Sequence, residues 1–344
     1  MLTRRSALMG AALLGASRPA VAAARVPHAK GQHADTPPAG TPGATPIGPV
    51  DTAARWAFIM DFNTGAELMN KAADEEMPPS SMTKLMTLYI VYSRLKDGRM
   101  KLDDTLPISE RAWRMGGSKM FVQIGEQVKV EDLIRGIEVD SGNDACIVLA
   151  EAISGSEPQF AELMNETAKK LGLTHSVFRN STGWPDPEQH MSPRDIAMLA
   201  AAIIRQFPDY YHYASEKTFR YNRIEQGNRN PLVQKGTADG LKTGHTEAGG
   251  YGLVASTLRG NRRVILVLNG MDSMHQRAEE GERLMDWAFN NFEDVTLFAG
   301  NEAVEHVPVW LGAAPTVPLV VANAGALVVT MPRNWQKTAS IKLD

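Results

Sequence analysis

Apolar residues follow two different spacings along the chain, which predict strands near both ends of one folded region and helices between them. Runs with the length and composition of strands cover residues 54–61, 66–70, 251–258 and 263–269. Segments with helical spacing of apolar residues cover 84–91, 130–137, 144–153, 160–171, 191–207 and 278–289. Short turns join the strands into pairs. We therefore expect an α+β fold, a sheet with helices packed on it.

The pattern changes on both sides of this region. Residues 25–50 are rich in Pro, Gly, Ala and Thr and lack apolar periodicity, so we expect a disordered linker. Residues 294–344 contain short strand-like runs broken by Gly, Pro and Asn. They predict a small, incomplete all-β C-terminal domain of three or four strands, which is few for an independent sandwich. The folded region between them, 51–293, is expected to carry the chemistry.

Residues 1–24 have the features of an export signal. Arg4 and Arg5 precede a short apolar stretch, and small residues at positions 20–24 offer a cleavage site. The apolar stretch is shorter than the roughly 20 residues that a membrane span needs. The sequence therefore predicts export to the periplasm or cell envelope. The paired arginines are compatible with both the general secretory and the twin-arginine route.

Composition and charge exclude several classes of function. The chain has 344 residues with a formal net charge of -3, so it carries no basic footprint for nucleic acid. Cys146 is the single cysteine, which excludes an internal disulfide framework and a cysteine-based zinc site. It lies in an apolar run, where a buried packing role is expected. We expect neither a metal nor a cofactor.

Ser81 and Lys84 are the first candidate catalytic residues. They lie three positions apart in an expected helix, so the lysine amine can reach the serine hydroxyl; Ser80 lacks this spacing. A serine becomes a nucleophile when a base takes its proton. Lys84 can be that base if burial or a second cation, for which Lys242 is the candidate, lowers its pKa. Taken alone, the pattern is more typical of a helix cap followed by a solvated lysine.

Ser141-Gly142-Asn143 forms the second candidate motif, in a turn between two predicted helices. The Ser141 hydroxyl can relay a proton to a leaving amine, and the Asn143 amide can hold a substrate carbonyl. An ordinary helix-capping turn would have the same sequence. The motif therefore gains weight only from its companions.

Lys242-Thr243-Gly244 forms the third motif and precedes the second predicted strand pair. Lys242 and Thr243 can bind a terminal carboxylate, while Gly244 permits close approach of an extended peptide. The backbone N–H of His245 can join that of Ser81 as the second oxyanion donor. Taken alone, this motif is common in loops.

Together and in this order, the three motifs are the signature of penicillin-recognising serine enzymes. From about Asp51 to Asp344 the chain resembles the serine-type D-alanyl-D-alanine carboxypeptidases, the low-molecular-mass penicillin-binding proteins. The resemblance extends to the flanking segments 79–87, 141–145, 192–195 and 239–244. It implies a β-lactamase/transpeptidase-like core with an all-helical subdomain, followed by a β-rich domain.

The resemblance also implies roles and partners. Ser81 would be the nucleophile, Lys84 the general base, and Ser141 with Asn143 the proton relay and substrate holder. The residues for the substrate carboxylate and backbone would be Lys242, Thr243, Gly244 and His245. Arg229 and Arg277 are further candidates for carboxylate binding or loop support, although solvated surface arginines would look the same. The substrate would be a peptidoglycan stem peptide ending in D-Ala-D-Ala, and β-lactam antibiotics would be covalent inhibitors.

Two alternatives remain open from the sequence. A β-lactamase of the same fold needs a carboxylate before the Lys-Thr-Gly motif, and the nearest match, at Glu162, is one residue too short and lies in a predicted helix. A non-catalytic peptidoglycan-binding protein would not need every chemical position that is present here. Family members usually end in an amphipathic membrane-anchoring helix. Residues 335–344 do not show one, so membrane contact is left open.

Overall fold

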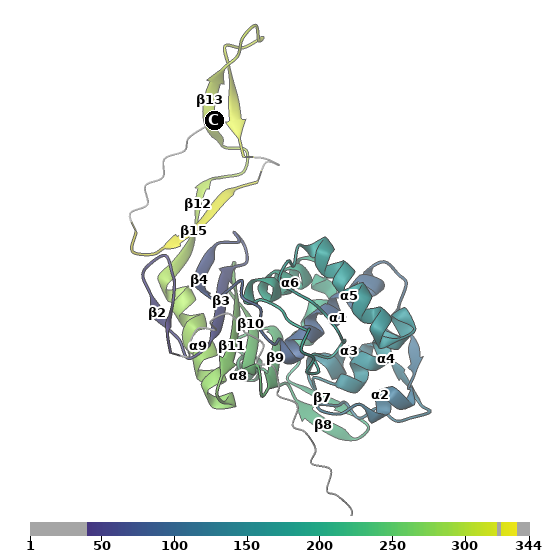
Figure 1. The fold of residues 1–344 in the computed structure, drawn as a ribbon. Coiled ribbons are helices and arrows are strands. Elements are labelled where there is room, and N and C mark those ends of the chain that lie inside the picture. The colour runs from purple at the N-terminus through teal and green to yellow at the C-terminus, as the bar shows by residue number, and fades with distance from the viewer. Residues whose placement is uncertain (1–39, 322–324, 336–344) are drawn as a thin grey trace, which may run out of the picture. The chain divides into compact units, whose positions relative to one another are not determined.

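The computed structural model describes residues 40–321 and 325–335 and confirms the predicted α+β class (Figure 1). Its helical elements are η1 (Ser80–Thr83), α1 (Lys84–Lys96), α2 (Glu110–Arg114), α3 (Val130–Glu138), α4 (Asn143–Ser154), α5 (Glu157–Leu171), α6 (Pro193–Gln206), α7 (Pro208–Tyr211), η2 (His212–Ser215), α8 (Pro231–Lys235) and α9 (Met274–Asn291). Its strands are β1 (Pro42–Gly43), β2 (Val50–Asp51), β3 (Trp56–Asp61), β4 (Glu67–Lys71), β5 (Thr105–Pro107), β6 (Gln127–Lys129), β7 (Thr218–Tyr221), β8 (Ile224–Gly227), β9 (Gly240–Thr246), β10 (Gly250–Arg259), β11 (Arg262–Met271), β12 (Phe292–Phe298), β13 (Ala303–Pro308), β14 (Thr316–Val320) and β15 (Leu327–Pro332).

A five-stranded antiparallel sheet joins the two ends of the folded region, as the apolar pattern predicts. Its strand order is β4-β3-β11-β10-β9. The first strand pair, which precedes the helices, thus lies beside strands that follow them. β9, which carries the Lys-Thr-Gly motif, is the last strand of the sheet. Its outer edge has no strand partner among the described residues.

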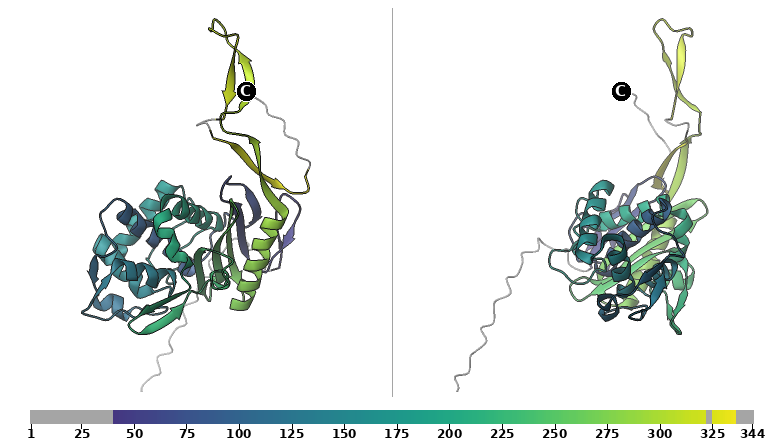
Figure 2. Two further views of the ribbon diagram at one scale, coloured as in Figure 1. Left: turned by 180° about the vertical axis from the view of Figure 1, so that it is seen from behind. Right: turned by 90° about the vertical axis from the view of Figure 1, so that its right-hand side faces the viewer.

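Both faces of this sheet are buried, which explains the continuous apolar run at residues 264–268 of β11. Along β11, Ile265 and Val267 pack into the core on the helical side. Val264, Leu266 and Leu268 alternate with them and pack into a second core that includes α9. Successive strand residues point to opposite faces, so one apolar strand can serve both cores. The views in Figure 2 show α9 on one side of the sheet and the other long helices on the opposite side.

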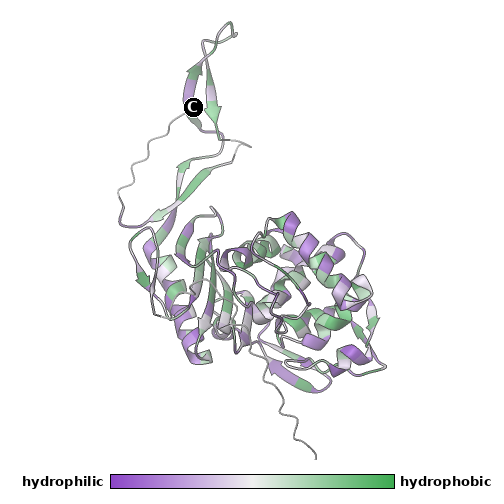
Figure 3. Cartoon of the chain, in the orientation of Figure 1, coloured by the Kyte–Doolittle hydropathy of each residue, from purple (hydrophilic) through white to green (hydrophobic). Residues whose placement is uncertain are grey.

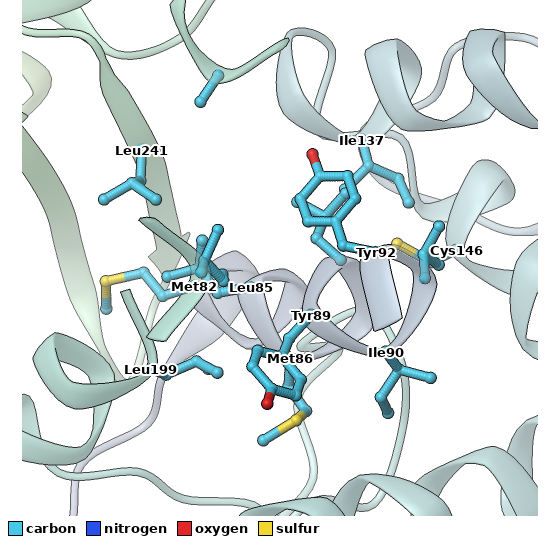
Figure 4. Packing of buried hydrophobic residues seen from close by; sticks show 14 of the residues in the cluster. Met82, Leu85, Met86, Tyr89, Ile90, Tyr92, Ile137, Cys146, Leu199 and Leu241 are labelled. Carbon is cyan, nitrogen blue, oxygen red and sulfur yellow. The ribbon is translucent and has the colours of Figure 1, made fainter. Parts of the chain in front are cut away.

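The helices α1, α3, α4, α5 and α6 enclose the larger core. Figure 3 shows polar and apolar colours alternating around the outer helices, as expected for helices with one buried face. Figure 4 shows side chains from several elements meeting around α1. Cys146 lies there and is fully buried, in agreement with a packing role. Burial raises the pKa of its thiol to about 12, so the thiol stays protonated.

Strand pairing begins earlier in the chain than the sequence predicted. The prediction of disorder is wrong for residues 41–50, because this segment pairs with the edge of the sheet. The backbones of Ala44 and Asn70 exchange hydrogen bonds of 2.8 and 2.9 Å, and β1 pairs with β2. The buried ammonium of Lys71 donates to the carbonyl of Thr41 at 2.8 Å. These contacts compensate for the low apolar content of the segment. The rest of the expected linker and the export signal lie outside the described residues.

The C-terminal part consists of two separate strand pairs, β12 with β15 and β13 with β14. The sequence predicted three of these strands and missed β12, which follows α9 without a linker. Phe292, the first residue of β12, is buried, and its carbonyl accepts a hydrogen bond from the Arg262 guanidinium at 2.7 Å. The Thr330 hydroxyl on β15 lies 2.5 Å from that of Thr64 in the β3–β4 turn. The short elements α2, α7, α8 and β5–β8 were also not predicted, because they span too few residues to show a period.

Candidate active site

Ser81 lies in the short 3₁₀ turn η1, and Lys84 is the first residue of helix α1, which follows directly. The Lys84 Nζ atom is 2.7 Å from Ser81 Oγ and also donates to the carbonyl of Thr182 at 2.6 Å. Lys84 is fully buried, and this burial lowers its pKa to about 8. A pKa of this size makes the neutral amine accessible near physiological pH, which a general base requires.

The loop at Thr182–Gly183 holds this pair from the opposite side. Gly183 has a φ of +83°, and a Cβ atom there would lie 1.8 Å from the carbonyl oxygen of Ser80. Only glycine therefore lets the loop approach the turn closely enough to receive the Lys84 ammonium. No motif marks this loop, so it was not among the sites predicted from the sequence.

Ser141 and Asn143 occupy the turn between α3 and α4, as predicted. Ser141 is buried and has a φ of +58°, a conformation that non-glycine residues rarely adopt. Asn143 is held by the loop before it: its backbone N–H donates to Ser118 at 2.7 Å and its side-chain amide donates to Gly116 at 2.8 Å. An amide has a second N–H, which leaves one donor for a substrate carbonyl.

Asp144 binds the same loop and was given no role by the sequence. Its fully buried carboxylate accepts hydrogen bonds from three consecutive backbone N–H groups, those of Met120, Phe121 and Val122, at 2.9–3.2 Å. The loop that carries Ser118 is thereby fixed to the Ser141 turn.

Replacing Asp144 with alanine is therefore expected to lower the free energy of unfolding by about 3 kcal/mol, because three buried donors lose their charged acceptor. The displaced loop should also slow acylation. Urea denaturation of the variant measures the first effect. Asp103→Ala, an exposed aspartate without a side-chain partner among the described residues, is the control. Equal stability of the two variants would show that water replaces the carboxylate.

Lys242 and Thr243 lie on β9, which runs past η1. Gly244 makes this approach possible: a Cβ atom there would lie 3.0–3.3 Å from atoms of Pro79, Ser80 and Ser81. A hydrogen bond of 2.9 Å between the hydroxyls of Ser80 and Thr246 joins the turn to the end of the strand. The nucleophile and the Lys-Thr-Gly motif, more than 150 positions apart in the sequence, are thus held together.

Burial and the charge of Lys84 lower the pKa of Lys242 to about 7. The repulsion between the two lysines disfavours the charge of both, as expected for a second cation beside the base. Arg229 is a further cation that lowers the pKa of Lys84. The site thus holds neighbouring cationic groups, of which the two buried lysines both have pKa values below the usual range.

A pocket of about 420 Å³ opens between these elements. It is lined by Ser81, Ser118, Ser141, Arg229, Thr243, Gly244, His245, Tyr251, Met274 and Arg277. Lys84, Asn143 and Lys242 are buried directly beside the lining residues. All ten residues selected from the sequence therefore belong to one region of the structure. Ser118, Tyr251 and Met274 were missed, since no motif contains them.

The two weaker candidates, Arg229 and Arg277, both reach this pocket. Arg229 donates to the Ser118 hydroxyl at 2.9 Å, and Arg277 donates to the backbone carbonyl of Arg229 at 3.3 Å. The Arg277 guanidinium also lies 5.9 Å from the centre of the Tyr251 ring. Burial lowers the pKa of both arginines, but each remains cationic at any physiological pH. They add positive charge to the wall around Thr243.

Two buried acids near the Ser141 turn oppose this positive charge. Glu138 accepts a hydrogen bond from the Tyr92 hydroxyl at 3.0 Å, and Asp140 is almost fully buried. Burial raises the pKa of each carboxyl group to about 7. Lys242 counteracts this rise at both sites, and Arg229 does so at Asp140. The site is thus a cluster of buried charges of both signs.

Glu162 lies on the exposed side of α5 and is not among the residues that line the pocket. The structure thus places this carboxylate on the helix surface, as its spacing predicted.

In the described part of the chain, no helix has both the length and the apolar character needed to cross a membrane.

The fold and the pocket together define a serine hydrolase. Residues 43–273 match the family described as D-alanyl-D-alanine carboxypeptidase, and the chain belongs to this family. It is 40% identical over 292 residues to D-alanyl-D-alanine carboxypeptidase DacC of Escherichia coli, covering 83% of this chain and 72% of that protein. It is 41% identical over 308 residues to DacA of Haemophilus influenzae, covering 87% of this chain and 77% of that protein.

Solved structures agree with the family assignment. The crystal structure of penicillin binding protein 5 from Haemophilus influenzae superposes with a TM-score of 0.78 at 39% identity, covering 85% of each chain. Penicillin binding protein 6B from Escherichia coli gives a TM-score of 0.72 at 37% identity, covering 84% of this chain and 88% of that chain. The resemblance inferred from the motifs is therefore confirmed across most of the chain.

Proposed function

We propose that this protein removes the terminal D-alanine from peptidoglycan stem pentapeptides through an acyl-enzyme on Ser81, and so limits cross-linking of the cell wall. One observation carries the proposal: Lys84 Nζ lies 2.7 Å from Ser81 Oγ, beside a pocket whose wall includes Thr243, Gly244 and His245 of β9. The arrangement supplies a nucleophile, a base and a carboxylate site in one place.

In the first half of the reaction, Ser81 Oγ attacks the carbonyl carbon between the two D-alanines while neutral Lys84 takes its proton. The backbone N–H groups of Ser81 and His245 are proposed to stabilise the oxyanion. When the C–N bond breaks, the leaving amine takes a proton through the Ser141 hydroxyl. D-alanine departs, and the rest of the peptide stays as an ester on Ser81.

In the second half, water attacks the ester and Lys84 again takes the proton. Ser81 is released with its hydrogen, and the shortened peptide leaves with a new carboxylate. A penicillin would form the same ester when its ring amide opens, but the leaving nitrogen would remain attached. This explains why β-lactams would be covalent inhibitors rather than substrates with rapid turnover.

Specificity for a chain end would come from the carboxylate of the last D-alanine. Lys242 and Thr243 are proposed to bind it, with Arg229 and Arg277 adding positive charge nearby. A bound anion favours the ammonium form, so it raises the low pKa of Lys242 and holds the lysine cationic in the complex. The carboxylate that penicillin carries would use the same contacts.

This proposal predicts that peptides ending in D-Ala-D-Ala are cut and that the same peptides with an amidated C-terminus are not. Lys242→Ala should lower acylation by peptide and penicillin about 10- to 150-fold, the loss expected for one charge-assisted hydrogen bond. D-alanine release and fluorescent-penicillin labelling measure both effects. Lys169→Ala, an exposed lysine on α5, is the control. Equal hydrolysis of free and amidated peptides would exclude a carboxypeptidase.

The lifetime of the penicillin adduct distinguishes the alternatives. A stable adduct supports the carboxypeptidase, rapid turnover supports a β-lactamase, and no labelling supports a non-catalytic binding protein.

We further propose that residues 1–24 direct export to the periplasm, where the peptidoglycan substrate lies. Detection of a protein shortened by about 24 residues in the periplasmic fraction, by N-terminal sequencing, tests this part.

A further inference from the structure

A second cavity, of about 180 Å³, adjoins the active-site pocket at the far end of β9. The two cavities share His245 and Tyr251, whose rings are in contact with centroids 4.0 Å apart and planes tilted by 32°. The remaining wall of the second cavity comes from the β9–β10 turn, the end of β11 and the residue before β3. Its charged lining residues are Arg55, Glu247 and Asp272.

None of these three charged side chains has an ion-pair or hydrogen-bond partner within the described ranges. Most other charged groups near the sheet are paired, such as Arg263 with Asp239 at 2.7 Å. The position of Arg55 is nevertheless defined, because a Cβ atom at Gly270 would lie 2.7–3.0 Å from its side-chain carbons. Its stem therefore lies across the strand end. The cavity holds one positive and two negative groups with unused hydrogen-bonding capacity.

The proposed reaction determines which part of a substrate reaches this cavity. If the terminal carboxylate lies at Thr243 and the scissile carbonyl at the His245 N–H, the peptide runs antiparallel to β9. Its earlier residues then continue toward Thr246 and Glu247, at about 3.3 Å per residue. The residue before the two D-alanines would lie at the end of β9, where its side chain can enter the cavity.

We propose that this cavity binds the side chain of the third stem-peptide residue and favours one that ends in both an ammonium and a carboxylate, as in 2,6-diaminopimelic acid. Glu247 and Asp272 would receive the ammonium, and Arg55 would receive the carboxylate. A cavity with both signs of charge matches such a side chain better than lysine, which would leave Arg55 without a partner. The inference rests on the proposed carboxypeptidase function and identifies its preferred substrate.

The test compares three peptides that end in D-Ala-D-Ala and differ only at the third residue: diaminopimelate, lysine or norleucine. We expect kcat/KM to fall in that order by about fivefold per lost charge, mainly through KM, since the groups are exposed and each contact is modest. Arg55→Ala should lower kcat/KM for the diaminopimelate peptide to the value of the lysine peptide. Glu247→Gln should lower kcat/KM for both the diaminopimelate and the lysine peptide. Neither variant should change kcat/KM for the norleucine peptide.

Arg220→Ala on β7 and Glu166→Gln on α5 change exposed charges that do not line this cavity, and they serve as matched controls. Equal kcat/KM for all three peptides in the unaltered protein would overturn the inference while leaving the carboxypeptidase intact. The inference would also be overturned if the Arg55 and Glu247 variants lost as much kcat/KM with the norleucine peptide as with the charged peptides. Such a result would indicate that these side chains have a structural role. If the norleucine peptide is not cut at all and penicillin does not label the protein, the proposed function itself fails.

Discussion

Ser81→Ala is expected to abolish covalent labelling by penicillin and to lower D-alanine release by at least about 10⁴-fold, as loss of an activated serine nucleophile does in other hydrolases. The reason is geometric. Ser81 Oγ is the hydroxyl that Lys84 Nζ reaches at 2.7 Å. Mass spectrometry of a penicillin-treated digest should place the acyl group on the peptide that contains Ser81.

Ser80→Ala is the matched control for this prediction. The Ser80 hydroxyl is directed to Thr246 at 2.9 Å rather than to Lys84, so its loss removes one ordinary hydrogen bond. We expect a cost of about 1 kcal/mol in stability, with most of the labelling retained. An inactive Ser80→Ala protein beside an active Ser81→Ala protein would show that the nucleophile is the other serine.

Acylation at saturating peptide should rise with pH and level off above about pH 8. The physical cause is the burial of Lys84, which lowers its pKa to about 8. The base is the neutral amine, so below this pKa each unit of pH should change the rate about tenfold. Saturating peptide matters because the bound carboxylate keeps Lys242 charged across the same range.

Lys84→Arg should be nearly inactive, because a guanidinium does not give up its proton in this pH range. The Lys169→Arg variant on α5 is the control, because it replaces an exposed lysine with arginine outside the pocket. Single-turnover acylation from pH 6 to 10 measures both the profile and the variant. A rate that does not change over this range, with chemistry limiting, would exclude Lys84 as the base.

The network around Lys84 also indicates why conservative changes far from the nucleophile should matter. Its ammonium is shared between Ser81 and the carbonyl of Thr182, on a loop that requires Gly183. The backbone N–H and hydroxyl of Ser181 both reach the Glu157 carboxylate, at 3.0 and 2.8 Å. Glu157, the first residue of α5, thus holds the loop at residues 181–183 that contacts Lys84.

Much of the fold was predictable because the relevant information is local and periodic. The helix around Lys84 and the strands at 251–258 and 263–269 show their period within a few residues. The segment 41–50 and strand β12 could not be found this way. Their order comes from pairing with distant partners, such as Asn70 and the end of β15, which leaves no period in the sequence.

The sequence by itself determined the identity of the chemical groups: a serine with a lysine three residues later, a Ser-Gly-Asn turn and a Lys-Thr-Gly segment. Spacing within one turn of helix is enough to bring Ser81 and Lys84 together. Only the tertiary structure decided how these groups function, because pKa values depend on burial and on charges from other elements. Burial and the charge of Arg229 lower the pKa of Lys84. Arg55 and Glu247 lie beside one cavity because a single sheet joins both ends of the folded region.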